Sequence, residues 1–439
     1  MLRDLSCWGL APAARFGVIS PPRTRSRLYR SLSTVLGIIR LARTGPQPRF
    51  GEFVTLTALV ISLVALSIDI MLPALQQIAG DLGARRTNDA QLVVTALFAG
   101  LAAGQMVYGP LSDSIGRKPA IHAGLLLFIL GCVMSILATD FTVLLAGRVL
   151  QGLGAAGPRS VIIALVRDRY QGRAMARIMS LVMAVFIMVP ALAPGIGQII
   201  LMIAHWRAIF GFLLAVAAIA LVWFALRQPE TLAPARRVGF SPLRIVLAVR
   251  ETCVNRVAFG YTLASGLIFG AFVGYLNSAQ QIFQIQYRLG ALFPLYFAAL
   301  ALAIGGASLV NARLVMRHGM RRLSAWALGL LAGLSLAFLV LAFALEGAPP
   351  LWALMAYLMV AFFCIGMLFA NFNALAMEPL GHIAGVGAAV VGSLTTLISM
   401  TLGAAIGQAY DGTVLPLVAG FALLGLAAIA VMCWTERGR

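Results

Sequence analysis

One acidic residue stands inside a segment that is otherwise apolar. Asp69 follows Ser67-Ile68 and precedes Ile70-Met71-Leu72-Pro73. An ionised, unpaired carboxylate at the centre of a lipid bilayer costs about 2.5–3.5 kcal/mol, so such a residue faces a protein interior or binds a proton. Because burial favours the neutral form of a carboxyl group, reversible protonation is the chemistry that Asp69 could carry. A permanent pairing with a cation and a position at the outer mouth are the alternatives.

Arg148 is the candidate partner of this carboxylate. It lies in another apolar segment, followed by Val149-Leu150-Gln151-Gly152-Leu153-Gly154. If the two segments are antiparallel helices, Asp69 and Arg148 lie about ten and about seven residues from the same membrane face, so their depths differ by only a few Å. Coupling between them is therefore allowed. The alternative is that Arg148 extends to the membrane interface.

A short charged connection joins the second and third apolar segments. It reads Gly109-Pro110-Leu111-Ser112-Asp113-Ser114-Ile115-Gly116-Arg117-Lys118-Pro119. We expect a tight hairpin in which Asp113 and Arg117 form a gate latch near the N-terminus of the eleventh segment, whose positive dipole end would attract Asp113. A surface turn with a weak ion pair is the alternative. The predicted gating motif comprises Gly109, Asp113, Gly116, Arg117 and Lys118.

The fifth apolar segment should bend and pack closely. Its prolines remove backbone donors and its glycines allow close helix approach; the residues concerned are Pro190, Pro194, Gly195 and Gly197. Other apolar segments carry uncharged polar side chains, which either line a cavity or join helices. The candidates for a substrate cavity are Gln151, Tyr275, Asn277, Gln280, Gln281, Asn371 and Asn373.

The elements that must position these residues are membrane helices. The chain is 61% hydrophobic and 11% charged, whereas soluble domains carry about 25% charged residues. About 20 helical residues cross a hydrocarbon core of about 30 Å. Twelve such segments are predicted, near 53–79, 91–112, 120–138, 141–165, 174–201, 207–227, 254–280, 291–315, 323–345, 351–377, 384–409 and 412–434.

The charge pattern sets the expected orientation. The formal net charge is +19, and the basic residues concentrate in alternate links and at both termini, which places both termini in the cytoplasm. No basic stripe with interleaved aromatic residues is present, so a nucleic-acid partner is not expected. The cysteines and histidines are scattered, which predicts neither a metal site nor another cofactor. Residues 1–50 are predicted to form a basic cytoplasmic tail, disordered or lying on the membrane surface.

The chain is predicted to fold as two halves. The longest link, 228–253, is rich in proline and arginine and separates residues 53–227 from residues 254–434. The eighth and ninth segments are joined by a weak repeat of the charged connection, in which Gly319 corresponds to Gly116 and Arg321 to Lys118. The predicted fold is all-α and integral to the membrane, with twelve helices in two pseudo-symmetric six-helix bundles around a substrate cavity.

Together these motifs resemble the major facilitator superfamily, and within it the drug:proton antiporters of the bicyclomycin/chloramphenicol resistance (Bcr/CflA) branch. The resemblance covers about residues 53–434. Its motifs are Asp69-x-x-Leu72-Pro73, the link 109–119, Arg148-x-x-Gln151-Gly152-x-Gly154, Arg167-Asp168, Pro194-Gly195 with the later Trp206-Arg207, and Arg313-Leu314-Val315. The sequence departs from the branch at Asn277-Ser278-Ala279-Gln280-Gln281, which lacks Ser-Pro, and at Pro190-Ala191, where many antiporters have Gly-Pro.

The resemblance implies a monomeric secondary transporter of a bacterial inner membrane that exports small amphipathic drugs or metabolites in exchange for protons. Asp69 would be the proton-responsive acid and Arg148 would modulate it. A carrier for one specific metabolite, such as a sugar or an amino acid, is the alternative. An enzyme is not expected because H-E-x-x-H and G-x-S-x-G elements are absent from the sequence. A receptor is not expected either, because the chain has no sizeable soluble domain.

Overall fold

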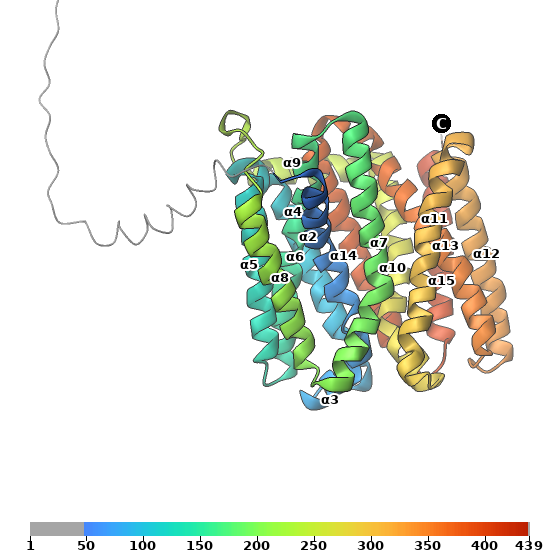
Figure 1. Ribbon diagram of the computed structural model, residues 1–439. Helices are drawn as coiled ribbons and strands as arrows, with labels where there is room; N and C mark the ends of the chain where they lie inside the picture. The colour runs from blue at the N-terminus through green and yellow to red at the C-terminus, as the bar shows by residue number, and fades with distance from the viewer. Residues whose placement is uncertain (1–47, 438–439) are drawn as a thin grey trace, which may run out of the picture. The chain divides into compact units, whose positions relative to one another are not determined.

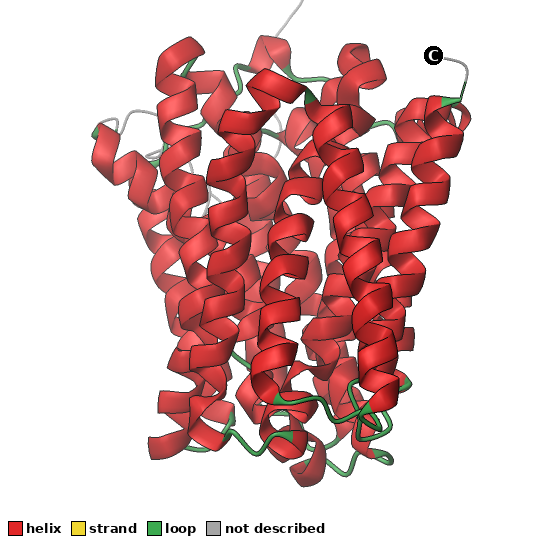
Figure 2. Cartoon of the chain, turned by 90° about the vertical axis from the view of Figure 1, so that its right-hand side faces the viewer, coloured by secondary structure: helices red, strands yellow, loops and turns green. Residues whose placement is uncertain are grey.

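The computed structural model describes residues 48–437, and within that range every regular element is a helix (Figures 1 and 2). The predicted basic tail lies outside the described residues except for positions 48–50. The long helices are α2 (Phe50–Asp69), α4 (Leu92–Ile115), α5 (Arg117–Ile136), α6 (Phe141–Arg169), α7 (Gly172–Ile203), α8 (Arg207–Arg227), α10 (Arg256–Gln280), α11 (Phe293–His318), α12 (Met320–Ala344), α13 (Leu351–Met377), α14 (Ala384–Gln408) and α15 (Leu415–Glu436). Two shorter helices are α3 (Leu75–Asp81) and α9 (Pro242–Val254).

These helices supply twelve apolar passes through a membrane. Ten continuous helical segments of 20 to 32 residues are apolar enough to cross, and an eleventh runs from Leu351 to Gln408 over 58 residues. That length exceeds twice what one crossing needs. It contains both α13 and α14, joined by the 3₁₀ turn Glu378–Ile383, in which Leu380 leaves helical geometry. The predicted twelve-helix membrane fold is therefore confirmed.

The two halves repeat the same packing. In the first half α2 packs on α7, α4 on α6 and α5 on α8. The equivalent pairs six passes later are α10 with α14, α11 with α13 and α12 with α15, and each of these pairs is also packed together. Two six-helix bundles with the same internal plan follow from this correspondence.

The internal repeat seen in the sequence has the same backbone geometry in both halves. Gly116 alone separates α4 from α5, and Gly319 alone separates α11 from α12. Their φ angles are +110° and +76°, which residues with a Cβ rarely adopt. A side chain at Gly116 would also displace the Glu230 carboxylate, which would lie 2.4 Å from the added Cβ.

The halves meet along two helix pairs, α4 with α14 and α7 with α11. Helix α9 and the C-terminal end of α15 mark one end of the bundle, here called the α9 end, and α3 marks the opposite end, called the α3 end (Figure 1). Large apolar side chains on the outward faces of the helices are exposed, including Leu226, Val340 and Trp352, each above 70%. A hydrocarbon environment suits such a surface.

Candidate functional site

Asp69 is the last residue of α2, at a break in the first membrane pass. The α-helix ends there, a 3₁₀ turn with Pro73 in its first turn follows, and α3 completes the pass. The Asp69 side chain is only 4% exposed. Among the described residues it has no hydrogen-bond or ion-pair partner, and it lines an internal cavity. The carboxyl group is thus removed from bulk water while facing a space that a ligand can enter.

Helix α7 packs against this break in the first pass. A Cβ built on Gly197 would lie 2.0 Å from the carbonyl oxygen of Ile70, the residue after Asp69. Glycine is therefore required for α7 to reach the backbone of the broken pass. Helix α7 continues through Pro190 and Pro194 without interruption. Pro190 lines the cavity, and Gly195 faces Pro294 of the second half at ordinary contact distance.

Arg148 is fully buried and holds three helices together. Its Nε donates to the carbonyl oxygen of Val93 at 3.0 Å, its Nη1 to Gln151 Oε1 at 2.6 Å and its Nη2 to the carbonyl oxygen of Ser67 at 2.9 Å. It forms no ion pair with Asp69. Arg148 therefore lies neither at the membrane interface nor in direct contact with the acid, but fixes the backbone two residues before it.

The central cavity has a volume of about 440 Å³ and lies between the two halves. Its described lining contains one acid, Asp69, and one cation, Arg159. The remaining wall is almost wholly apolar, with side chains from both halves. Its aromatic members are Phe98, Phe186, Phe269, Phe272, Phe297, Phe362 and Phe369. Such a wall binds apolar and aromatic groups without requiring a fixed orientation.

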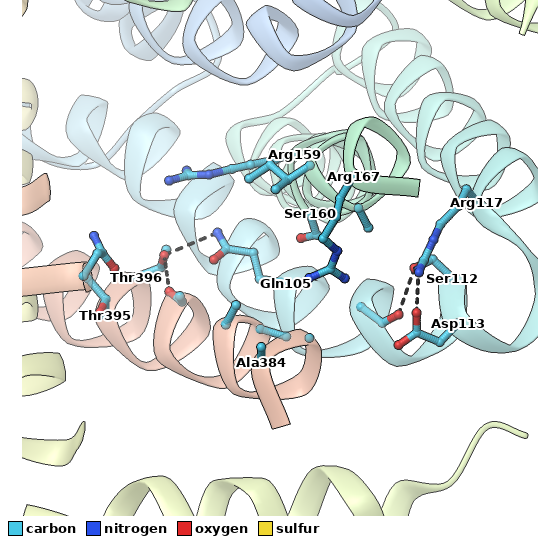
Figure 3. Close-up of a pocket in the computed structure, with 18 of the residues that line it drawn as sticks. Gln105, Ser112, Asp113, Arg117, Arg159, Ser160, Arg167, Ala384, Thr395 and Thr396 are labelled. Atoms are coloured by element: carbon cyan, nitrogen blue, oxygen red, sulfur yellow. Dashed lines mark hydrogen bonds and ion pairs between the residues drawn. The ribbon is translucent and has the colours of Figure 1, made fainter. Parts of the chain in front are cut away.

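A second cavity of about 320 Å³ adjoins the first toward the α9 end. The two share Arg159, Phe269 and Phe369 in their linings. This cleft is bordered by the last turns of α4 and α6 and by the first turns of α14, including Ala384 (Figure 3). The two spaces together lead from the α9 end to Asp69.

A charged cluster stands at the mouth of the cleft. Arg117 donates to Asp113 at 2.5 Å, to Ser112 at 2.7 Å and to Asp168 at 3.0 Å, and Figure 3 shows its side chain directed at the first two. Asp113 Oδ2 lies 3.8 Å from a Cβ position built at Gly385, in the first turn of α14. Asp113 is thus held by Arg117 and lies beside the N-terminus of the eleventh pass.

The link between the halves is fastened to the same cluster. Glu230 accepts hydrogen bonds from the backbone N–H groups of Arg117 at 3.0 Å and of Lys118 at 3.1 Å. These are otherwise unsatisfied donors at the start of α5, where a carboxylate is favoured. The Lys118 ammonium group donates to the carbonyl oxygen of Ala225 at 2.7 Å.

At the α3 end, amide side chains join the two halves. The Asn88 amide donates to the carbonyl oxygens of Gln408 at 3.0 Å and Tyr410 at 2.9 Å. It accepts from Gln281 at 2.8 Å, and Gln281 also accepts from Gln91. We call these five residues the amide clasp. Burial, with a smaller contribution from the charge of Asp411, raises the pKa of the Tyr410 phenol, so the clasp has no group that titrates near neutral pH.

The Major Facilitator Superfamily model matches residues 57–408 of the chain. The chain belongs to the major facilitator superfamily. Members of this superfamily are transporters, not enzymes. A bicyclomycin resistance protein homolog of Haemophilus influenzae is 28% identical over 87% of this chain and 95% of its own length. Multidrug resistance protein D of Escherichia coli is 29% identical over the same shares of the two chains.

A solved structure of a D-xylose-proton symporter has the same fold. It superposes with a TM-score of 0.66 over 87% of this chain and 96% of its own, at 13% identity. This major facilitator protein is therefore a multi-pass membrane transporter, and each of the two resistance-protein relatives covers 87% of its length.

The polar residues predicted for the cavity of this major facilitator protein occupy several different places. Asn373 lines the cleft at the α9 end. The other six are not among the residues lining either of the two cavities. Three glutamines make hydrogen bonds: Gln151 accepts from Arg148, Gln281 belongs to the amide clasp and Gln280 donates to Gln284. Asn371 pairs with Asn311 through two hydrogen bonds of 3.0 Å. Tyr275 packs against Phe297 and Phe362, and Asn277 lies against Gly407. Gln281 and Asn371 join helices through hydrogen bonds, whereas the Tyr275 hydroxyl and both amide atoms of Asn277 are buried without a hydrogen-bond partner among the described residues.

Arg159 is the residue that sequence reasoning missed. The sequence carries a signal for it, since Arg159 is a cation inside an apolar segment, about three helical turns after Arg148. The same reasoning that singles out Asp69 applies to it. The family resemblance in α6 rests on the Arg148 motif and does not include Arg159.

Proposed function

We propose that this transporter exports small amphipathic compounds from the cytoplasm in exchange for protons. Asp69 binds the proton in the central cavity, and the compound occupies the same cavity. The observation that carries the proposal is a buried carboxyl group that has no partner among the described residues and faces a cavity with an aromatic wall. A proton and a ligand that compete for one site exchange across the membrane when the site opens alternately to its two sides.

The arrangement of the two ends supports alternating access. The amide clasp closes the α3 end across the two halves. The cleft leads from the α9 end to the central cavity. The structure thus corresponds to the state in which the site is reached from the α9 end. Rocking one half against the other about the central cavity would give the opposite state.

The arginine distribution supports a cytoplasmic location for the α9 end. Arginine and lysine concentrate in the links after the second, fourth, sixth and eighth passes, all of which lie at this end. By the positive-inside rule both termini then lie in the cytoplasm of a bacterial inner membrane. Arg85 and Arg86, at the α3 end, are the main exception. The lobes we propose are residues 53–227 and 254–434, in a monomer.

Inward proton flow can drive uphill export. Moving one elementary charge across a membrane potential is worth about 2.3 kcal/mol per 100 mV.

The names of the two relatives, a bicyclomycin resistance protein homolog and a multidrug resistance protein, favour drugs or similar compounds as substrates. A proton-coupled carrier for one metabolite remains the second candidate, and the shared fold of the D-xylose-proton symporter supports it.

Replacement of Asp69 tests the proposal. In inverted membrane vesicles energised by respiration, the wild-type protein should accumulate a fluorescent drug and should stop when a protonophore is added. Asp69→Asn should abolish this accumulation. The matched control is Glu346→Gln, an exposed acid in the turn after α12, which should transport normally. Unchanged proton-driven accumulation in Asp69→Asn would reject the proposed role.

A further inference from the structure

Arg159 differs in its contacts from the buried Arg117 and Arg148 of the first half. Arg148 donates hydrogen bonds to three protein oxygens, and Arg117 forms ion pairs with two carboxylates. Arg159, in contrast, makes no hydrogen bond or ion pair within the described part of the chain. Its side chain lines both the central cavity and the cleft. In Figure 3 it extends away from the Arg117 cluster.

The position of Arg159 makes an unpaired charge expensive. It lies about ten residues, or about 15 Å, before the end of α6. An arginine at the middle of a membrane helix costs about 2.5–3.5 kcal/mol on insertion scales, and such residues mark ligand pathways by default. A structural role would require a protein acceptor at the guanidinium, and none of the described residues supplies one. Its partner therefore comes from the contents of the cavity.

The cavity holds two opposite charges on different helices. Asp69 is the last residue of α2 and Arg159 lies on α6. Both line the central cavity, whose other lining residues are largely aromatic or aliphatic. We propose that the exported compound is a zwitterionic aromatic amphipath. Its carboxylate or other oxyanion pairs with Arg159, its amine pairs with ionised Asp69, and its rings lie against phenylalanines such as Phe269 and Phe362. This inference rests on the proton-exchange function proposed above and specifies its substrate class.

The two charges give the exchange a physical mechanism. A proton that reaches Asp69 removes the negative charge that holds the amine, and the compound loses one of its two anchors. Arg159 keeps its charge at any physiological pH, so the oxyanion end provides selectivity rather than coupling. Arg167, exposed in the lining of the cleft, adds a second cation on the route to the cavity. It attracts the anionic end of an entering compound.

A pair of dyes tests the charge preference directly. Rhodamine B is a zwitterion at neutral pH, and its ethyl ester is a cation with the same aromatic body. Binding to the purified full-length protein in detergent is measured by fluorescence anisotropy, without a proton gradient. The wild-type protein should bind rhodamine B more tightly than the ester. Arg159→Gln should weaken rhodamine B binding about tenfold or more, because a charge-assisted pair is lost, and should leave ester binding unchanged or stronger.

Two further variants make the test decisive. Arg159→Lys, which keeps the charge, should recover part of the rhodamine B affinity. Arg173→Gln, an exposed arginine at the start of α7 that lines neither cavity, should bind both dyes like the wild type. Retained ester binding shows that Arg159→Gln is folded. The inference is overturned if the wild type binds the ester as tightly as rhodamine B, or if Arg159→Gln weakens both dyes equally.

This experiment separates the substrate class from the coupling mechanism. Dye binding in detergent depends on Arg159 and not on proton flow. If the dyes show no charge preference while Asp69→Asn still abolishes proton-driven accumulation, the zwitterion inference fails and the proposed function stands. If Asp69→Asn leaves accumulation unchanged, the proton-exchange function fails, whatever the dyes show.

Discussion

Arg148 donates from Nη2 to the carbonyl oxygen of Ser67 at 2.9 Å, and Ser67 stands two residues before Asp69. The same guanidinium reaches Val93 on α4 and Gln151 on its own helix. One arginine thus fixes the backbone that carries the acid, because its planar fork supplies donors in three directions at once.

We therefore expect Arg148→Lys to impair transport although the charge is kept. A lysine ammonium is a single point donor and cannot bond α2, α4 and Gln151 together. Proton-driven drug accumulation in inverted vesicles should fall about tenfold, which corresponds to about 1.4 kcal/mol, within the range for lost hydrogen bonds to charged groups. The control is Arg173→Lys, at an exposed position. Transport at the wild-type rate in Arg148→Lys would show that charge alone suffices.

Gly197→Ala should disrupt the break in the first pass. The added Cβ would lie 2.0 Å from the carbonyl oxygen of Ile70, so α7 must move away. Overpacking of this kind costs about 1–3 kcal/mol, and a lower melting temperature in detergent and loss of transport should follow. Gly195→Ala is the matched control on the same helix, since its Cβ would have one neighbour at 3.9 Å. Equal melting temperatures for the two variants would argue against the close approach.

Asn88→Ala should weaken closure at the α3 end. The change removes three hydrogen bonds between the halves, at roughly 0.5–1.5 kcal/mol each. A loss of about 2 kcal/mol shifts the equilibrium between the two access states about 30-fold, since each 1.4 kcal/mol is a factor of ten. Fluorescence energy transfer between labels at the α3 ends of the two halves should report wider separation.

The control for this change is Gln76→Ala in α3, whose amide nitrogen has no hydrogen-bond partner among the described residues. It should leave the separation as in the wild type. If Asn88→Ala and Gln76→Ala give the same distances, the clasp does not hold the halves together.

The strength of the amide clasp should not depend on pH. Four of its five residues are amides, and burial raises the pKa of the fifth, Tyr410, so that its phenol stays protonated at neutral pH. In the Asp69→Asn variant the same label separation should then be constant from about pH 6 to about pH 8. The wild-type protein should respond to pH over that range, because Asp69 remains titratable. A pH response that persists in Asp69→Asn would place the proton sensor elsewhere.

Much of the fold could be predicted from the sequence because lipid imposes a simple pattern. Apolar runs long enough to cross a membrane predict all twelve passes. Arginines in alternate links predict their orientation. The predicted boundary between the last two passes, at residues 409–412, is confirmed, since α14 ends at Gln408 and α15 starts at Leu415. Helix α9 in the linker was not predicted, because its 13 residues are too few to cross a membrane and its surroundings are rich in proline.

The candidate site was harder to predict than the fold. Asp69 stands out because a charge within an apolar run has few structural explanations. The places of the uncharged amide side chains could not be predicted, because the sequence does not show which face of a helix meets a neighbour. Asn371 pairs with Asn311 across two passes, whereas Asn373 lines the cleft only two residues away. Arg159 is also a charge within an apolar run, but only the structure shows that it lines the cavity and lacks a partner among the described residues.

The anchoring of Glu230 has a mechanical consequence. With Glu230 bound to the start of α5, and Val238 N–H donating to the carbonyl oxygen of Asp113 at 3.0 Å, the linker belongs to the first half as far as residue 238. Helix α9 starts at Pro242 and packs on α14 and α10, so it belongs to the second half. The three residues 239–241 are left between two bodies, and a side chain at Gly239 would meet nothing within 4 Å. In the alternating access proposed above, these three residues would be the pivot of the linker, because the movement of one half against the other would have to be taken up there.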